Sequence, residues 1–246
     1  MSGALAGRRI LITGAAKGIG RAALLRCLQE GAAVFGLDRD AGALAALDAP
    51  GLAVDVCDAG AVAQAVAAAA ARLGGLDGVV NAAGIDLVAE FGAMALDDWS
   101  RVLAVNLTGP MLVMQAAYPH LKAAGGGTIV NVSSAAGLSP LQHRTAYCAS
   151  KAALQMASKA LALEAAPFGI RVNTVCPGAV ETSLFRSSID GTADPAAAYE
   201  AVRARYALKR VAEPEEIAAA ILWLTSAQSS YVTGTALAVD GGRTFH

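Results

Sequence analysis

The 246-residue sequence has few charged side chains and almost no net charge. Asp, Glu, Lys and Arg make up 16% of the chain, and the formal net charge is −1. Binding to nucleic acid or to an anionic membrane needs a basic surface, so we expect neither partner. No apolar run approaches the ~20 residues that span a bilayer, and the first residues, MSGALAGRR, do not resemble a signal peptide. A cytoplasmic location is expected by default.

Cysteine is also scarce, and its spacing does not suit a metal or a disulfide framework. The four cysteines form no CxxC pair and have no companion histidine at metal-ligand spacing. We therefore expect reduced thiols and no metal site.

The chain is instead rich in aliphatic residues, with 55% of it hydrophobic. This composition and length suit one large α/β domain over residues 1–246, because no linker or charge block divides the sequence. Short apolar runs alternate with helical patterns such as 59–73, which predicts a parallel sheet with helices on both faces. The expected strands are 9–13, 33–37, 52–56, 76–81, 128–132, 170–176 and 236–240. Helices are expected near Ala41, from an Asp cap after Leu96 through about Leu121, over 147–168 and from 213–216 onward.

The first strand leads directly into the glycine-rich segment GAAKGIG, which also holds Lys17 and Ile19. Gly14, Gly18 and Gly20 permit a tight turn and a close approach of the backbone to a ligand. The helix after this segment offers unpaired N–H groups and a positive dipole end to a pyrophosphate. The strand, turn and helix together predict a dinucleotide site.

The second strand ends on Asp38, 18 residues beyond Gly20. An acid at this place hydrogen-bonds the adenosine ribose of NAD and repels the 2′-phosphate of NADP. A competing interpretation is that Asp38 caps the helix that begins near Ala41. Arg39 comes directly afterwards and is able to accept a phosphate, so we expect NAD in preference to NADP without excluding the latter.

Tyr147 and Lys151 are four residues apart at the head of a predicted helix and therefore share a face. An ammonium within about 4–6 Å would lower the pKa of the phenol, which could then exchange a proton with a substrate oxygen. Taken alone, the spacing more often marks a surface lysine beside a half-buried tyrosine. The functional interpretation needs a hydride carrier, which the glycine-rich segment supplies.

Two other features stay open on the residues alone. Asn106 lies among apolar neighbours in a predicted helix, where a structural hydrogen bond and a catalytic relay are both possible. The polar, glycine-containing segment 179–210 comes after a strand end, a common place for a lid over a substrate.

From end to end, the sequence resembles the short-chain dehydrogenases/reductases. The motifs that carry the resemblance are TGAAKGIG (13–20), NAAG (81–84), VNLTG (105–109), VNVSS (130–134), YCASK (147–151), CPGAVET (176–182) and DGG (240–242). The resemblance implies a Rossmann-type, doubly wound sheet of seven strands and a nicotinamide cofactor. It also implies hydride transfer between an alcohol and a ketone, and a homotetramer.

The resemblance also implies roles for single residues. Tyr147 is the acid/base, Lys151 lowers its pKa and holds the nicotinamide ribose, and Ser134 hydrogen-bonds the substrate oxygen, with Ser133 one position off that spacing. Asn106 holds a water in the proton relay. The implied cofactor contacts are Asp55 and Val56 at the adenine, Asn81, Ala82, Ala83 and Gly84 in the middle of the cleft, and Pro177, Gly178, Val180 and Thr182 at the nicotinamide amide.

Arginines near the site suggest a carboxylate-bearing substrate, although any one of them is more often solvated or ion-paired. Arg144, three residues before Tyr147, resembles an arginine of cytosolic 3-hydroxybutyrate dehydrogenases. Arg186 and Arg205 flank the lid, and Arg243 lies in the tail GGRTFH, which is similar to that of sugar-acid dehydrogenases such as 2-keto-3-deoxy-L-fuconate dehydrogenase. We therefore expect a small hydroxy acid or keto-sugar acid.

Three alternatives remain. A 3-oxoacyl-carrier-protein reductase shares the motifs but usually takes NADP and needs a basic surface. A neutral secondary-alcohol or steroid dehydrogenase is compatible with the same catalytic residues. A non-catalytic NAD-sensing protein on this fold commonly lacks the tyrosine or lysine, and this chain keeps both.

Overall fold

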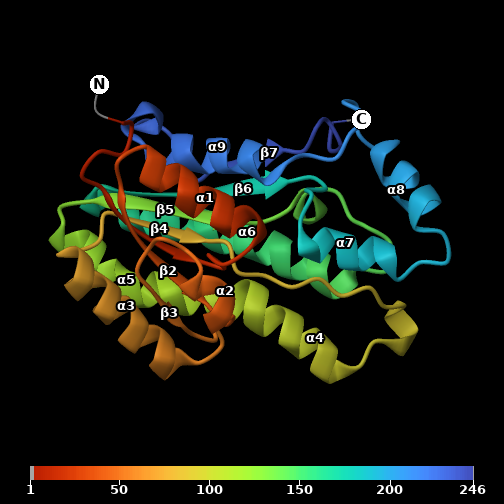
Figure 1. Ribbon diagram of the computed structural model, residues 1–246, viewed down its shortest axis with the longest axis horizontal. Coiled ribbons are helices and arrows are strands. Elements are labelled where there is room, and N and C mark those ends of the chain that lie inside the picture. The colour runs from red at the N-terminus through yellow and green to blue at the C-terminus, as the bar shows by residue number, and fades with distance from the viewer. Residues whose placement is uncertain (1–2, 246) are drawn as a thin grey trace.

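A computed structural model describes residues 3–245, and its centre is a seven-stranded sheet (Figure 1). Every strand pair is parallel, and the order across the sheet is β3-β2-β1-β4-β5-β6-β7. The order reverses between β1 and β4, where doubly wound sheets bind ligands at the carboxyl ends of their strands. The strands are β1 (Arg9–Thr13), β2 (Ala33–Asp38), β3 (Gly51–Ala53), β4 (Gly78–Asn81), β5 (Gly127–Val132), β6 (Ile170–Pro177) and β7 (Ala236–Val239).

Helices cover both faces of the sheet, which confirms the predicted fold class (Figure 1). The α-helices are α1 (Gly18–Gln29), α2 (Ala41–Ala45), α3 (Ala59–Leu73), α4 (Leu96–Leu103), α5 (Gly109–Ala123), α6 (Thr145–Ala165), α7 (Ser183–Asp190), α8 (Pro195–Arg203) and α9 (Pro214–Thr225). A π-helical turn, η2 (Ala104–Thr108), joins α4 to α5. Short 3₁₀ turns lie at η1 (Phe91–Ala93), η3 (Ala135–Gly137), η4 (Ala166–Phe168) and η5 (Ala227–Ser229).

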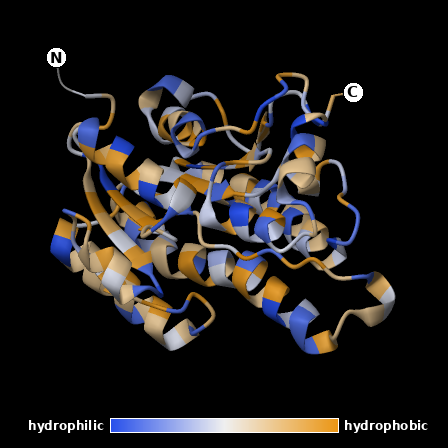
Figure 2. Cartoon of the chain, turned by 45° about the vertical axis from the view of Figure 1, so that its right-hand side comes forward, coloured by the Kyte–Doolittle hydropathy of each residue, from blue (hydrophilic) through white to orange (hydrophobic). Residues whose placement is uncertain are grey.

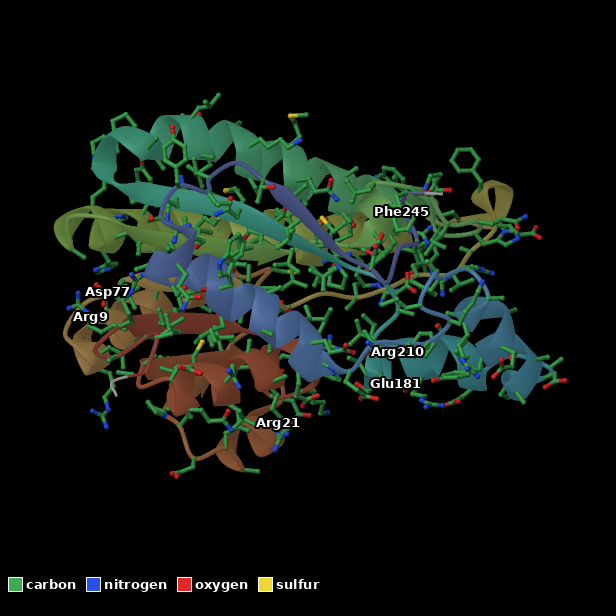
Figure 3. All side chains as sticks on the ribbon, turned by 90° about the horizontal axis from the view of Figure 1, so that it is seen from above. Arg9, Arg21, Asp77, Glu181, Arg210 and Phe245 are labelled. Atoms are coloured by element: carbon green, nitrogen blue, oxygen red, sulfur yellow. The ribbon has the colours of Figure 1, made fainter. Side chains whose placement is uncertain are left out.

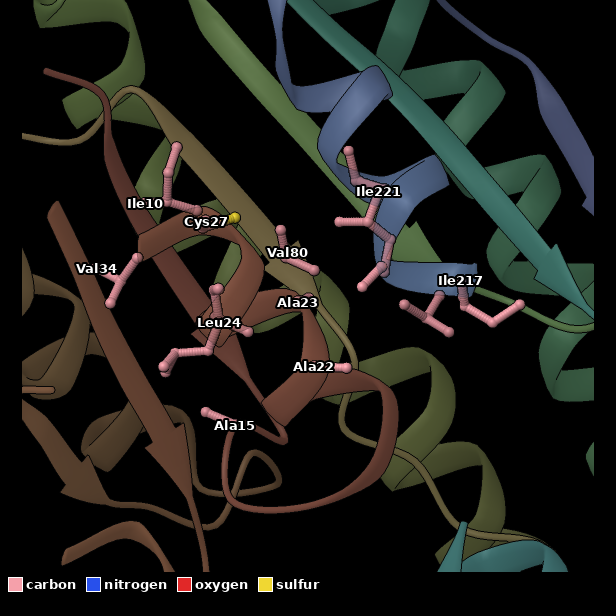
Figure 4. Packing of buried hydrophobic residues seen from close by; sticks show 14 of the residues in the cluster. Ile10, Ala15, Ala22, Ala23, Leu24, Cys27, Val34, Val80, Ile217 and Ile221 are labelled. Atoms are coloured by element: carbon pink, nitrogen blue, oxygen red, sulfur yellow. The ribbon is translucent and has the colours of Figure 1, made fainter. Parts of the chain in front are cut away.

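Successive residues of β1 enter opposite layers of the core, as the pleat of a strand requires. Ile10 and Ile12 belong to the hydrophobic cluster beneath α1 and α9, which also contains Val80 and Ile221 (Figure 4). Leu11 belongs to the cluster beneath α3, α5 and α6. Both faces of the strand are therefore buried, which explains why the central strands are continuous apolar runs rather than alternating ones.

An ion pair joins β1 to the start of β4 at the amino end of the sheet. The Asp77 carboxylate accepts hydrogen bonds from the backbone N–H of Arg9 at 2.9 Å and from its Nε at 2.7 Å. Figure 3 shows the two side chains together at that end of the molecule. Arg9 also lowers the pKa of the Asp77 carboxyl by direct hydrogen bonding.

Several predicted strand boundaries were wrong by a few residues. The third strand was expected over 52–56 but ends at Ala53, because the Asp55 carboxylate accepts the Cys57 N–H and turns the chain. The fourth was expected over 76–81 but begins at Gly78, after the Asp77 side chain is held by Arg9.

Two helix predictions also need correction. No Asp caps α4: its N-cap is Ala95, and Asp97 and Asp98 lie in the first turn, where the helix dipole favours acids. The helix α6 begins at Thr145 rather than 147 and ends at Ala165, where the chain tightens into η4.

The segment predicted as a lid forms α7 and α8, which extend beyond the carboxyl ends of the strands (Figure 1). The helices around the sheet carry both hydrophilic and hydrophobic residues (Figure 2). Within residues 3–245, no helix has both the length and the apolarity that crossing a bilayer requires.

Candidate active site

Three side chains predicted to be catalytic meet at the carboxyl end of β5. Ser134 comes just after β5, Tyr147 lies in the first turn of α6, and Lys151 lies one turn later on the same helix. The Ser134 hydroxyl lies close enough to Tyr147 to lower the pKa of the phenol. Both line a cavity of about 340 Å³ together with Lys151. A substrate oxygen that enters this cavity can therefore meet both hydroxyl groups.

The neighbouring Ser133 also lines the cavity, but its hydroxyl is engaged in two hydrogen bonds within the protein, which distinguishes the two serines of the motif. Its hydroxyl donates to the Lys151 carbonyl at 2.8 Å and accepts from Gln155 Nε2 at 3.0 Å. These bonds fix α6 against the end of β5. Ser134 is thus the serine available to a substrate, and its hydroxyl also accepts the Ala136 N–H at 3.0 Å.

The Lys151 ammonium is buried and donates a hydrogen bond to the Val132 carbonyl at 2.9 Å. Burial lowers its pKa to about 8. The lysine therefore keeps most of its charge at neutral pH and loses it in mildly alkaline solution.

The pKa of Tyr147 differs from the sequence-based prediction. Burial raises the pKa of the phenol to about 12, and the hydrogen bond from Ser134 offsets only part of that rise. Lys151 Nζ lies 5.8 Å from the centre of the ring and makes its hydrogen bond to Val132 instead. Desolvation therefore outweighs the lysine here, and the tyrosine is protonated at neutral pH.

Asn106 lies in the π-helical turn η2, which opens the helix at this position. Its side-chain oxygen accepts the Ile85 N–H at 2.9 Å, and its nitrogen donates to the Ile85 carbonyl at 2.9 Å and to Ser150 Oγ at 3.1 Å. The amide therefore ties the loop after β4 to α6. A Cβ added at Gly84 would lie 3.3 Å from both Asn106 Oδ1 and Lys151 Nζ, which places those two groups beside the same glycine.

At two positions of the glycine-rich turn, the chain's own backbone passes too close for any side chain. Gly14 has a φ of 65°, and a Cβ added there would lie 2.7 Å from the Ala83 nitrogen. A Cβ at Gly20 would overlap the Gly14 carbonyl oxygen. Only glycine fits at these two positions, so the residues present suit a dinucleotide.

Asp38 does not cap α2, so the competing interpretation of this acid was wrong. Its carboxylate accepts the Ala16 N–H at 3.0 Å and the Asp40 N–H at 3.0 Å, at the edge of the glycine-rich turn. The cap of α2 is Asp40, which accepts the Ala43 N–H at 3.0 Å. Arg39 is exposed.

The other predicted cofactor contacts fall into two groups. Ile19, Pro177, Gly178, Val180 and Thr182 line the same cavity as Tyr147. A second group lies outside that lining, at or just after the ends of β3 and β4: Asp55, Val56, Asn81, Ala82, Ala83 and Gly84. The glycine-rich turn contributes Gly14, Lys17 and Gly18. Asn81 donates to Asn131 Oδ1 at 2.8 Å, and its own Oδ1 is buried without a partner among the described residues.

The predicted substrate arginines separate. Arg144 lines the cavity, but its Nε donates to the Asp86 carboxylate at 2.7 Å, and both side chains are largely buried. Arg243 lines the cavity and donates from Nη2 to the Ser139 carbonyl at 2.9 Å, whereas its buried Nη1 has no partner among residues 3–245. Arg186 lies outside the lining and pairs with Glu181 at 2.7 Å.

One charged residue of the cavity wall was missed from the sequence. Asp86 comes two residues after the NAAG motif and lines the cavity. A charged residue just beyond a motif at a strand end is the signal that could have identified it. Arg205, noted in the sequence as an arginine that flanks the lid, also lines the cavity, whereas Arg186 does not.

A glycine-lined cradle for a dinucleotide beside a Ser–Tyr–Lys set defines a nicotinamide-dependent oxidoreductase. A family model described as enoyl-(acyl carrier protein) reductase matches residues 14–244. The chain belongs to the short-chain dehydrogenase/reductase family.

Characterised relatives span almost the whole chain. It is 39% identical to D-threitol dehydrogenase of Mycolicibacterium smegmatis, over 98% of this chain and 94% of that protein. It is also 39% identical to 3-oxoacyl-acyl-carrier-protein reductase of Thermotoga maritima, over 97% and 98%. Among solved structures, ligand-free aldohexose dehydrogenase of Thermoplasma acidophilum superposes with a TM-score of 0.94 at 29% identity, covering 98% of this chain and 96% of that one.

Proposed function

We propose that the protein uses NAD to interconvert the hydroxyl and keto forms of a small acid, such as a hydroxy acid or a keto-sugar acid. The observation that carries this proposal is the charge of the cavity wall. Arg144, Arg205, Arg243 and Lys151 line it together with the single carboxylate of Asp86. An excess of positive charge in a partly enclosed space favours an anionic substrate.

The residues that would hold the cofactor fall into two groups. The glycine-rich turn and Asp38 would hold the adenosine half, and Thr182 and Val180 would contact the nicotinamide half. When bound, NAD supplies a carbon that accepts or returns a hydride. Asp38 supports NAD over NADP because a carboxylate at the ribose repels a 2′-phosphate.

The chain itself would position the substrate oxygen and move its proton. Ser134 and Tyr147 would both hydrogen-bond that oxygen, since both side chains line the same cavity and Ser134 is near enough to affect the Tyr147 pKa. In ketone reduction the protonated Tyr147 donates its proton to the oxygen. In alcohol oxidation the proton moves the other way, onto ionised Tyr147; burial opposes that ionisation, and the nearby Lys151 charge would have to offset part of its cost.

Arg144 and Arg243 would hold the carboxylate of the substrate. Arg243 supports this role best, because its guanidinium lines the cavity and keeps a buried nitrogen without a partner among the described residues. Arg144 is already paired with Asp86, so it would share its charge between that carboxylate and the substrate. We propose no such contact for Arg186 in this cavity, because the side chain pairs with Glu181 outside it.

A polyol or sugar is the second candidate substrate. Asp86 favours it, because a carboxylate in the cavity accepts hydrogen bonds from neutral hydroxyls. Similarity to a D-threitol dehydrogenase and to an aldohexose dehydrogenase supports the same alternative.

We also propose that the protein acts in the cytoplasm as a homotetramer. Exposed apolar side chains on the outer faces of α5 and α6 support self-association. They include Met111, 43% exposed, Met156, 65% exposed, and Leu163, 81% exposed. Light scattering on the purified protein tests the assembly, and a monomer at micromolar concentration would contradict it.

Initial rates on a substrate panel test the proposed function. The panel contains hydroxy acids, sugar acids, polyols and neutral secondary alcohols, each offered with NAD and with NADP. Turnover of acids with NAD is the expected result. Turnover of polyols alone would favour the second candidate. Turnover of hydrophobic alcohols alone would contradict the assignment of the cavity, and turnover with NADP alone would contradict the assignment of the cofactor.

A further inference from the structure

Two carboxylates and a lysine meet where β2 ends and the glycine-rich turn passes by. Asp38 accepts the Ala16 N–H at 3.0 Å, and Lys17 Nζ lies 2.6 Å from the Asp40 carboxylate. We propose that Asp40 is a positioning residue for cofactor choice: by pairing with Lys17, it withholds that lysine from the 2′-phosphate of NADP. The inference rests on the proposed use of NAD and assigns part of that preference to a residue beyond Asp38.

The geometry fixes Asp40 in place while it holds the lysine. One of its oxygens, Oδ1, accepts the Ala43 N–H at 3.0 Å as the cap of α2. The other, Oδ2, accepts from Lys17 at 2.6 Å. The hydrogen bond between them lowers the pKa of the Asp40 carboxyl and raises the pKa of the Lys17 ammonium, so each group favours its charged form.

A 2′-phosphate would arrive within reach of this lysine. The Asp38 carboxylate, expected at the ribose hydroxyls, is bonded to the backbone of Ala16, the residue directly before Lys17. Asp38 and Lys17 are also close enough for their charges to interact. The long, flexible lysine stem allows its ammonium to contact an anion there when no carboxylate holds it.

The pair is exposed, with 60% of the Lys17 side chain and 40% of the Asp40 side chain open to solvent. Such an ion pair contributes little to stability. It does cancel the only cation that the turn itself offers, since GAAKGIG contains no other basic residue. Removing the charge of Asp40 should therefore alter phosphate affinity much more than folding.

Asp40→Asn is the sharpest variant, because asparagine caps a helix about as well as aspartate and has nearly the same shape. The variant frees Lys17 and removes one negative charge. Asp48→Asn is the matched control: it removes the same charge from an exposed position in the same β2–β3 connection. Thermal unfolding of each variant checks that the fold is kept.

The experiment measures binding by calorimetry and needs no turnover. The probes are adenosine 5′-diphosphate and adenosine 2′,5′-bisphosphate, which carry the adenosine half of the two cofactors. Asp40→Asn should bind the bisphosphate about fivefold more tightly than the wild type does, a size typical of one surface charge. Binding of adenosine 5′-diphosphate should change less than twofold, and Asp48→Asn should leave both affinities unchanged.

Lys17→Met in the Asp40→Asn background should abolish the gain. The proposal is overturned if Asp40→Asn matches the Asp48→Asn control, or if the gain persists without the lysine. The wild-type ratio of the two affinities tests the proposed NAD preference separately, because it does not involve the variants.

Discussion

The Asp86–Arg144 ion pair offers the sharpest test of how the cavity recognises its substrate. Substitutions of its two members should change the KM for an acidic substrate in opposite directions. Arg144→Met leaves the Asp86 carboxylate unpaired beside Tyr147, where it repels a carboxylate-bearing substrate. Asp86→Asn frees the guanidinium and should strengthen binding of the same acid.

The size of the expected change in KM follows from the interaction of two unit charges, one on the protein and one on the substrate carboxylate, roughly 6 Å apart. At an effective dielectric of about 20 the interaction is ~2.8 kcal/mol. The pair is partly open, with 19% of Arg144 and 16% of Asp86 exposed, so we reduce this figure by half. The remaining ~1.4 kcal/mol corresponds to about tenfold in KM, upward for Arg144→Met and downward for Asp86→Asn.

The assay compares KM and kcat for an acid from the substrate panel and for a neutral analogue of it. Arg101→Met is the control, because Arg101 pairs with Asp98 on α4 outside the cavity. The neutral analogue should respond less than threefold to each variant. If both cavity variants raise KM for the acid alike, the ion pair only fixes the loop after β4 against the start of α6, and the carboxylate assignment is refuted.

Three further predictions concern stability and cofactor binding. Gly20→Ala should abolish calorimetric binding of adenosine 5′-diphosphate, because the added Cβ overlaps a carbonyl oxygen of the turn; unchanged binding would contradict the cradle. Asp77→Asn should destabilise the protein by about 1 kcal/mol at pH 7 in urea unfolding. The folded-state pKa of Asp77 is depressed, so this contribution is present above the unfolded value near ~4 and is lost as pH falls through the folded pKa; a loss that persists equally at pH 2 would count against the ion pair. Lys151→Met should stabilise the protein by about 2 kcal/mol at pH 7, because burying the charged ammonium is unfavourable there. As pH rises from about 8 toward the unfolded value near ~10, the folded lysine is already neutral and the gain should shrink; a gain that is constant up to pH 10 would contradict the lowered pKa.

The fold and the catalytic set could be predicted because their signals are local. The glycine-rich turn sits between an apolar strand and a helix, and the spacing of Tyr147 and Lys151 places them on one face of α6. For both features, the residues that carry the signal lie within a few positions of one another in the sequence.

The features that sequence missed depend on partners far apart in the chain. Arg144 pairs with Asp86, which lies 58 positions away in the sequence, and Lys17 pairs with Asp40, which lies 23 positions away. The Tyr147 pKa depends on how completely the surrounding atoms exclude water, which the spacing of two residues does not encode. The π-helical turn around Asn106 contains no glycine or proline at its centre from which it could have been predicted.

The measurement that tests the central claim most directly compares the wild type with Tyr147→Phe. The claim is that Tyr147 exchanges the proton while NAD and the substrate exchange the hydride. NADH formation with the best acid of the panel should fall at least about a hundredfold in the variant. Binding of adenosine 5′-diphosphate should stay within twofold, because the change is confined to the substrate cavity. A variant that retains more than a tenth of wild-type turnover would contradict the role assigned to Tyr147.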